Sequence, residues 1–520
     1  MSPAVKQPLP RRTALRTAAV IVAGSVGAAS IAACTASPEG SDAPDADEDD
    51  GSQGPDAAGS LVIAADERAG VVDSTTSAHE QSLAASQALL DRAAVVVVAS
   101  TDADVTAADT LARDLGVPML VAGAGLTTEL DRLRTHTVVR LGAASGPDSV
   151  TASEGRTEVD GADTDAVAAL PGLPRSPVAH SALVLLPPEG TLPPAVGATV
   201  AAAGADRITV RDSDPRLTPD AFEPLAAGTG PTLGLGVELG PAERLTQRIR
   251  TVRRAPQLPA GGFLPFPGRR MIALYGHPDT NALGMLGEQP AGDAVRRAQS
   301  LADEYAALSD EPVIPAFELI ASVASEAAGD DGDYSRRTPI ERLLPWVEAA
   351  EAAGIYVVID LQPGRTDFLT QAEHYEPLLR RPFVGLALDP EWRLKPGQRH
   401  LRQIGSVAID EVNRVGAWLA ALVREHDLPP KVLTLHQFRP SMIPGRERLD
   451  TSLDEVQWLV HADGQGGQGD KQATWRRLMR DLPAGVWLGW KNFEDEDLPM
   501  LTPEQTMSQV SPTPWFVSYQ

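Results

Sequence analysis

The chain has 520 residues, 43% of them hydrophobic and 22% charged, so it is long enough for several domains and apolar enough to bury large cores. Its 45 Lys and Arg residues against 70 Asp and Glu residues give a net charge of -25, which repels phosphate backbones, so nucleic acid is not an expected partner. A single cysteine excludes both a disulfide framework and a thiolate metal cluster.

The N-terminus has the pattern of an export signal. Three arginines precede a weakly apolar stretch, 17–33, which the single cysteine follows directly. The tetrapeptide Ile31-Ala32-Ala33-Cys34 resembles the lipobox of bacterial lipoproteins, which implies cleavage before Cys34 and lipidation of its thiol. We therefore expect residues 1–33 to be a lipoprotein signal peptide and Cys34 to anchor the protein on the extracytoplasmic face of the cell membrane. A short transmembrane anchor is the alternative, although the stretch is barely long enough to span a bilayer.

Residues 34–60 have the composition of a disordered tether. Eight carboxylates lie among Ser, Pro, Gly and Ala, and such a segment cannot bury enough apolar surface to order itself. Mutual repulsion of the acids would extend it. We expect it to hold the folded part of the protein away from the membrane.

The distribution of aromatic residues divides the rest of the chain in two. All eight Trp and all six Tyr residues follow residue 270, whereas Phe222 is the only aromatic residue between 61 and 260. A Pro- and Gly-rich segment, 256–268, lies between the two compositions and is the expected linker. The predicted domains are therefore 61–255 and 269–520.

The first domain alternates short Val-rich stretches with Ala-rich helical ones, which is typical of an open parallel α/β, Rossmann-like structure. The expected strands are 61–65, 93–100, 118–122, 136–141, 182–186 and 207–210, and the Gly-, Asp- and Thr-rich stretch 143–177 is expected to be irregular, so that the region could form two similar lobes. Residues 93–142 resemble a cell-wall-binding repeat of the type called repeat 2, which implies binding of a cell-wall polymer. A generic Rossmann-like lobe is the alternative, and no Gly-x-Gly-x-x-Gly follows a strand to indicate a dinucleotide.

The second domain has the pattern of a (β/α)8 TIM barrel. Eight predicted strands alternate with helical stretches over about 250 residues, the usual size of this fold. The strands are expected at 271–275, 313–318, 355–360, 383–388, 432–436, 457–462, 486–490 and 515–519. The helices after the fifth and seventh strands are poorly defined.

Polar and aromatic side chains follow nearly every predicted strand, at the end of the barrel where such folds carry their chemistry. We expect them to line one pocket and to bind a ligand there. The candidates for binding are Tyr275, Glu318, Asp360, Trp392, His436, Gln437, Asp463, Lys491 and Tyr519.

The most specific signal is the sequence Asp389-Pro390-Glu391-Trp392 after the fourth strand. Two carboxyl groups two residues apart suit glycoside hydrolysis, in which one acid protonates the leaving oxygen. We expect Glu391 to be the catalytic acid, its pKa raised by burial and by the charge of Asp389. Residues 384–392 resemble the strand-four motif of family 18 chitinases, although the earlier acids of that motif are absent. The resemblance implies a glycoside hydrolase-like barrel in a secreted lipoprotein.

The predicted function is that of a surface lipoprotein acting on or binding envelope carbohydrate, with no cofactor and no metal. A metal-dependent enzyme is one alternative, with His277, His436, His461 and Asp463 as conceivable ligands. A non-catalytic lipoprotein that binds polysaccharide or protein through a degenerate barrel is the other alternative.

Overall fold

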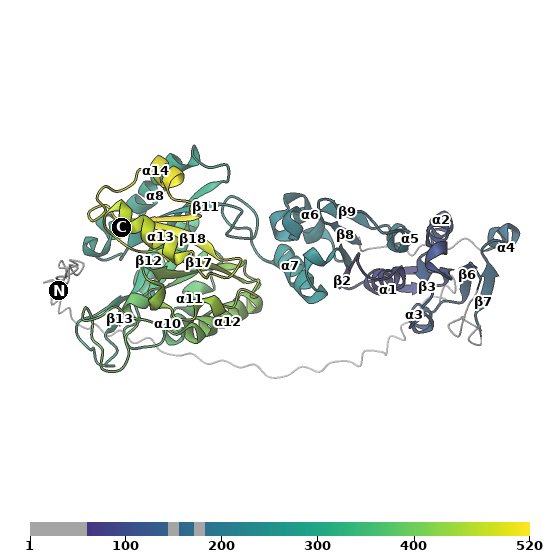
Figure 1. Ribbon diagram of the computed structural model, residues 1–520, viewed down its shortest axis with the longest axis horizontal. Coiled ribbons are helices and arrows are strands. Elements are labelled where there is room, and N and C mark those ends of the chain that lie inside the picture. The colour runs from purple at the N-terminus through teal and green to yellow at the C-terminus, as the bar shows by residue number, and fades with distance from the viewer. Residues whose placement is uncertain (1–59, 144–154, 171–181) are drawn as a thin grey trace, which may run out of the picture. The chain divides into compact units, whose positions relative to one another are not determined.

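The computed structural model describes residues 60–143, 155–170 and 182–520. The predicted signal peptide, Cys34 and the tether lie outside these ranges. Within them the chain is a mixed α/β protein, with a closed barrel of eight parallel strands in its C-terminal part and smaller parallel sheets before it (Figure 1). No helix in the described ranges combines the length and the apolar character that crossing a bilayer requires.

The N-terminal part contains two four-stranded parallel sheets in place of one continuous sheet. The first has the order β5 (Met119–Val121), β4 (Val95–Ala99), β6 (Thr137–Leu141) and β7 (Thr157–Asp160), and the second the order β2 (Ala69–Val72), β10 (Thr232–Leu235), β8 (Leu183–Leu186) and β9 (Asp206–Thr209). A short antiparallel pair, β1 (Leu61–Ile63) and β3 (Leu90–Ala93), completes the region. The six expected strands form, but the sequence patterns did not reveal β2, β3, β7 and β10.

The helices of this part are α1 (Ala78–Leu89), α2 (Val105–Leu115), α3 (Leu126–Arg132), α4 (Thr164–Ala168), α5 (Pro194–Ala203), α6 (Pro219–Ala227) and α7 (Ala242–Arg254). Ser77 and Glu80 form a capping box that starts α1. Helix α5 is apolar on nearly all sides, which is the pattern of a buried helix. One hydrophobic cluster joins it, through Val196, to Val98 of the first sheet and Val184 of the second. The two sheets therefore share a core.

The barrel closes because its first strand pairs with both its second and its last. Its parallel strands are β11 (Arg270–Gly276), β12 (Val313–Ala324), β14 (Tyr356–Leu361), β15 (Val384–Leu388), β16 (Lys431–Gln437), β17 (Val456–Ala462), β18 (Trp487–Asn492) and β19 (Phe516–Tyr519). All eight match the expected strands. Strand β12 is longer than expected, because the apolar stretch 319–324 continues it beyond Glu318 to pair with a short antiparallel strand, β13 (Ser335–Arg337).

Helices surround the barrel (Figure 1). They are α8 (Ala291–Ala306), α9 (Ile340–Ala352), α10 (Phe368–His374), α11 (Glu376–Leu379), α12 (Ile409–Glu425), α13 (Gln468–Leu478) and α14 (Pro503–Gln509). Only short 3-10 turns connect β16 to β17, and α14 after β18 is short, as the weak helical patterns indicated. The resulting architecture is TIM-barrel-like.

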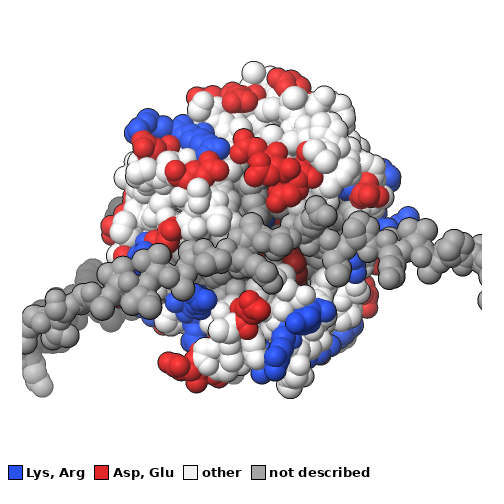
Figure 2. Space-filling view, turned by 90° about the vertical axis from the view of Figure 1, so that its left-hand side faces the viewer, with Lys and Arg blue, Asp and Glu red and all other residues white. Residues whose placement is uncertain are grey.

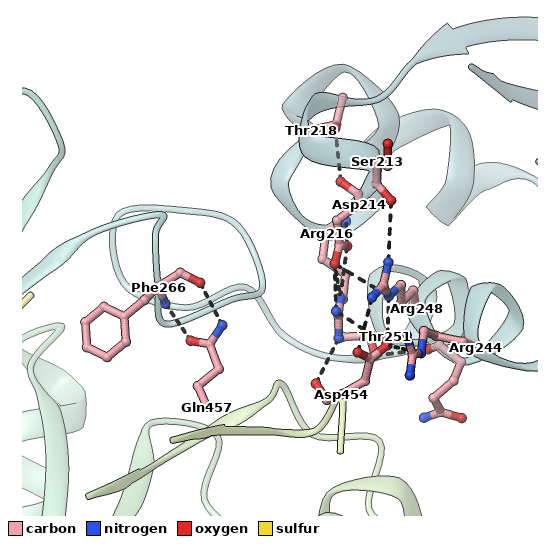
Figure 3. A network of polar contacts seen from close by, with 11 residues as sticks. Ser213, Asp214, Arg216, Thr218, Arg244, Arg248, Thr251, Phe266, Asp454 and Gln457 are labelled. Atoms are coloured by element: carbon pink, nitrogen blue, oxygen red, sulfur yellow. Dashed lines mark hydrogen bonds and ion pairs between the residues drawn. The ribbon is translucent and has the colours of Figure 1, made fainter. Parts of the chain in front are cut away.

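A polar network connects the N-terminal part to the barrel (Figure 3). Arg248 of α7 donates to both carboxylate oxygens of Asp454, at 2.7 and 3.2 Å, just before β17. Arg216 donates to the backbone oxygen of Asp454 at 3.1 Å and pairs with Asp214. Nearby, the side chain of Gln457 exchanges two hydrogen bonds with the backbone of Phe266. The segment 256–268, expected to be a linker, is thus held by the barrel at Phe266.

Replacing Asp454 by Asn should destabilise the protein, because Arg216 and Arg248 would lose one of their two shared counterions in a largely buried place, with Asp214 as the other. We expect the free energy of unfolding to fall by about 1–3 kcal/mol, as for other hydrogen bonds to charged groups. Asp427→Asn is the matched control, since it also removes a partner of an α7 arginine, but Arg250 and Asp427 are 40% and 32% exposed. The free energy of unfolding of Asp427→Asn should fall by only about 0–1 kcal/mol. Equal losses in urea unfolding would contradict the assigned importance of Asp454.

The amino end of β16 contains a lysine that is completely buried. The side-chain nitrogen of Lys431 donates to the backbone oxygens of Arg381 and Val384, both at 2.8 Å. Burial lowers the pKa of Lys431 to about 7. The folded protein therefore holds this lysine largely uncharged in mildly basic solution.

This burial predicts a pH dependence of stability. Between the folded pKa of about 7 and the ordinary value of 10.5, the unfolded chain binds more protons at Lys431 than the folded chain, so the free energy of unfolding should rise with pH across that window. Lys431→Met removes this contribution. The stability of the parent relative to Lys431→Met should increase from neutral pH to about pH 9, by at most about 1.4 kcal/mol per pH unit. The free energies of unfolding of the two proteins are measured by thermal or urea unfolding. A difference between them that does not change with pH would contradict a buried, uncharged Lys431.

Candidate functional site

A layer of polar side chains fills the interior of the barrel at the carboxyl ends of its strands. Side chains alternate between the two faces of each strand, so every second residue faces the interior. Deeper in the barrel these residues are apolar and include Met271, Ala273, Val358, Ala387 and Val432. One step further along, every strand or the residue after it contributes a polar group: Tyr275, Glu318, Asp360, Asp389, His436, His461, Lys491 and Ser518.

His436 lies at the centre of this layer. Its Nε2 is 2.9 Å from Glu318 Oε1 and 3.9 Å from Asp360 Oδ1, while its Nδ1 is 3.1 Å from Asp463 Oδ2. Burial disfavours a charged imidazole, but the carboxylates of Glu318 and Asp360 outweigh it and hold the pKa of His436 well above its usual value. Without another cation at this place, the ring is therefore an imidazolium that three carboxyl groups surround.

The two nearest carboxyl groups respond in opposite ways to their surroundings. Burial alone would raise the pKa of Glu318, yet His436 and His461 bring it well below its usual value. For Asp360 burial dominates, and together with the charge of Glu318 it raises the pKa to about 6 despite His436. Glu318 is therefore an ionised acceptor, whereas Asp360 can take up or release a proton near neutral pH.

Lys491 and Tyr275 occupy another part of the layer. The ammonium of Lys491 is 3.1 Å from Asp463 Oδ1 and 3.3 Å from the centroid of the Tyr275 ring, a cation–π contact. The Tyr275 hydroxyl donates to Asp360 Oδ2 at 3.0 Å. Burial, and next to it the charge of Asp360, raises the pKa of Tyr275 well above its usual value, so this hydroxyl stays protonated.

His461 belongs to the same cluster. Its Nδ1 lies 3.6 Å from Glu318 Oε1 and its Nε2 lies 3.2 Å from Ser518 Oγ. Burial lowers the pKa of His461, with Glu318 opposing the shift, so the ring is neutral. Glu318, His436 and His461 each direct one possible metal-ligand atom at a shared space, and these atoms lie within 4.8 Å of one another.

The acid pair after β15 differs from the expectation in its burial. Asp389 is buried and accepts a hydrogen bond from the backbone N–H of Glu391 at 3.2 Å, while Glu391 is the more exposed member. Burial, followed by the charges of Asp360 and Glu391, raises the pKa of Asp389 well above its usual value. The buried acid that retains a proton is therefore Asp389, whereas the expectation had placed the raised pKa on Glu391.

Two predicted binding residues face away from the layer. Gln437 follows the inward-facing His436, and its amide donates to the backbone oxygen of Arg439. Tyr519 follows the inward-facing Ser518, and its hydroxyl lies 2.6 Å from that of Tyr305 on α8. Neighbouring residues of a strand point to opposite faces, so neither side chain lines the polar layer. Their binding of a substrate remains a prediction.

The aromatic residues do not provide the stacking surface expected for a sugar. Tyr275, Trp392 and Tyr519 are all 5% or less exposed. The ring of Trp392 packs 4.7 Å from that of His400. On the face in Figure 2, groups of acidic side chains and groups of basic side chains are separated by uncharged residues.

Sequence reasoning missed Ser518, which holds His461. The signal that could have revealed it is the two-residue period, because Phe516 faces the apolar interior and Ser518 is the next inward position. His277, considered as a metal ligand, is engaged elsewhere: its Nε2 is 3.0 Å from Thr338 Oγ1 and its Nδ1 accepts the N–H of Asp279.

Comparisons with known proteins add little. No protein-family model matches the chain, and no curated protein matches it. Among solved structures, the chain is similar to an HpcH/HpaI aldolase from Desulfitobacterium hafniense DCB-2, at 12% sequence identity and a TM-score of 0.24, over 49% of this chain and 86% of the aldolase. A TM-score this low supports no conclusion about activity. The class of the protein rests on its own closed parallel barrel and the polar layer inside it.

Proposed function

We propose that this protein is a lipid-anchored, extracytoplasmic enzyme whose TIM-barrel-like domain hydrolyses envelope carbohydrate. The observation that carries the proposal is a pair of acids at the rim of the polar layer, to which every barrel strand contributes a residue. Asp389 is buried and has a raised pKa, whereas Glu391 is more exposed. A glycosidase needs such a proton reserve at neutral pH, because its acid must protonate a leaving oxygen.

In this proposal the two carboxyl groups have different tasks. Glu391 is the member that a substrate can reach, and it transfers the proton to the glycosidic oxygen. Asp389 lies beneath it and retains a proton because its own ionisation is opposed by burial and by neighbouring negative charge. In this proposal the two groups share one proton, which Asp389 holds at rest and Glu391 delivers. Glu318 keeps its negative charge in this layer, whereas Asp360 can change its charge near neutral pH.

The N-terminal sheets have a separate task in the proposal. Their stretch 93–142 carries the resemblance to a cell-wall-binding repeat, so we assign them retention of the protein at the polymer. The folded part is secured to the membrane by the lipid on Cys34, and the acidic tether gives it reach.

Replacing Glu391 by Gln should lower hydrolysis of a glycan substrate by at least about 10²-fold, since a positioned acid contributes roughly 10² to 10⁴. Asp389→Asn should cause a similar loss while the fold persists, because the amide keeps the shape of a carboxyl group that is already protonated. Glu494→Gln is the control: its side chain is 53% exposed on the loop after β18 and should leave turnover unchanged. The measurement is initial rates on a panel of cell-wall glycans, and full activity in Glu391→Gln would refute the assigned acid.

A second function is favoured by one observation, the complete burial of Glu318, Asp360, His436, His461 and Lys491. Groups sealed from solvent and paired with one another can serve stability alone, as in a degenerate barrel that only binds polysaccharide or protein. Glycan binding by the parent protein without any turnover would select this alternative over the hydrolase.

The anchoring is tested separately. Cys34→Ala should move the protein from the membrane fraction to the soluble fraction, because two acyl chains are needed for stable attachment and none can be added without the thiol. Cys34→Ser, which also lacks a thiol, should behave identically. Unchanged sedimentation with membranes in both variants would show that another segment anchors the chain.

A further inference from the structure

Three side chains from three barrel strands converge on one enclosed space. Glu318 comes from β12, His436 from β16 and His461 from β17, and all three are completely buried. Glu318 Oε1 is 2.9 Å from His436 Nε2 and 3.6 Å from His461 Nδ1. Atoms that share a metal ion at about 2.0–2.2 Å must lie roughly this far apart.

His436 and Glu318 form an ion pair when no metal ion is bound, but the converging atoms do not form hydrogen bonds with one another. His436 Nε2 approaches Glu318 Oε1 closely, but the two do not meet the geometry of a hydrogen bond. Within the described ranges, His436 Nε2, His461 Nδ1 and both carboxylate oxygens of Glu318 have no hydrogen-bond partner. Leaving buried polar atoms unpaired is costly. Atoms directed at a common centre, and away from each other's hydrogen-bonding axes, are the arrangement that a bound cation requires.

The outer nitrogens of both histidines are held in the manner of metal ligands. Asp463 accepts from His436 Nδ1 at 3.1 Å, and Ser518 Oγ is 3.2 Å from His461 Nε2. The carboxylate of Asp463 accepts from Nδ1, which leaves the lone pair of His436 on Nε2, the nitrogen that faces the centre. Ser518 can hold His461 in the same way when its hydroxyl accepts from Nε2. Lys491 pairs with the other oxygen of Asp463, at 3.1 Å. The positive charge of Lys491 is thus balanced by a carboxylate that is not one of the three converging residues.

We propose that Glu318, His436 and His461 bind one divalent transition-metal ion. Asp360 Oδ1 lies 3.9 Å from His436 Nε2, but it does not belong to the group of atoms that lie within 4.8 Å of one another. Two imidazoles and one carboxylate form a ligand set that Zn²⁺ accepts, with the fourth position left open. The inference goes beyond glycoside hydrolysis and does not depend on it.

The test is metal binding by the full chain, without any glycan. Protein stripped with a chelator is titrated with Zn²⁺ and its metal content is measured after gel filtration. In parallel, Co²⁺ is added as a spectroscopic probe, because its visible absorption reports histidine and carboxylate coordination. We expect one tightly held Zn²⁺ per chain and a Co²⁺ spectrum of low coordination number.

Variants separate the proposed site from other histidines. Glu318→Gln and His461→Gln should abolish the stoichiometric ion and the Co²⁺ spectrum. His277→Gln is the matched control, because His277 is also a buried histidine at the carboxyl end of a barrel strand but is bonded to Thr338, and this variant should bind like the parent. Ser518→Ala removes only the outer support of His461 and should weaken Zn²⁺ binding about 10- to 100-fold.

The outcomes decide the proposal. Because ligand variants can fail to fold, Ser518→Ala supplies an independent answer from a mild change. A parent that retains no ion, or one whose ion persists equally in Glu318→Gln, His461→Gln and Ser518→Ala, would overturn the site. A parent that binds the ion and cleaves no glycan would refute the proposed hydrolase and leave the metal site intact.

Discussion

Charge balance inside the barrel is the constraint on which the rest of the site depends. Four carboxyl groups, those of Glu318, Asp360, Asp389 and Asp463, are enclosed at the carboxyl end of the barrel. An unpaired buried charge costs several kcal/mol, so each acid needs a cation, a proton or a hydrogen-bond donor nearby. Histidines, a lysine and a tyrosine hydroxyl from neighbouring strands meet part of this need, and the proposed metal ion would meet more of it. The closed barrel allows this compensation, because an inward-facing residue from each strand lies in the same enclosed interior.

The same balance couples the members of the layer. The pKa of His436 depends on Glu318 and Asp360, and that of Asp360 depends in turn on Glu318. A change in the charge of one group therefore alters the protonation of the others. The pair at the rim is subject to this field as well, because Asp360 contributes to the raised pKa of Asp389. The acids at the rim and the cluster below them therefore form one electrostatic system.

The sequence predicted the barrel well and the orientation of its residues less well. Strands buried on both faces appear as continuous apolar runs, so their positions could be found, while the inward and outward faces could not be told apart by polarity. Tyr519 and Gln437 were misplaced for this reason, although counting in twos from Phe516 or Val432 would have corrected them. The burial of Asp389 relative to Glu391 depends on how the chain turns after β15, which no local pattern specifies.

The order of the strands in the N-terminal part affects how the chain acquires its structure. Strand β2 precedes the whole of the first sheet, yet its one parallel partner is β10, which comes after that sheet in the chain. The first sheet is thus inserted within the second. During synthesis from the N-terminus, β2 is made long before its pairing partner β10. Pairing between strands so far apart in the sequence is intrinsically slow. An exposed strand edge during that interval is a site for aggregation, which gives the cell a reason to shield the chain until the second sheet is complete.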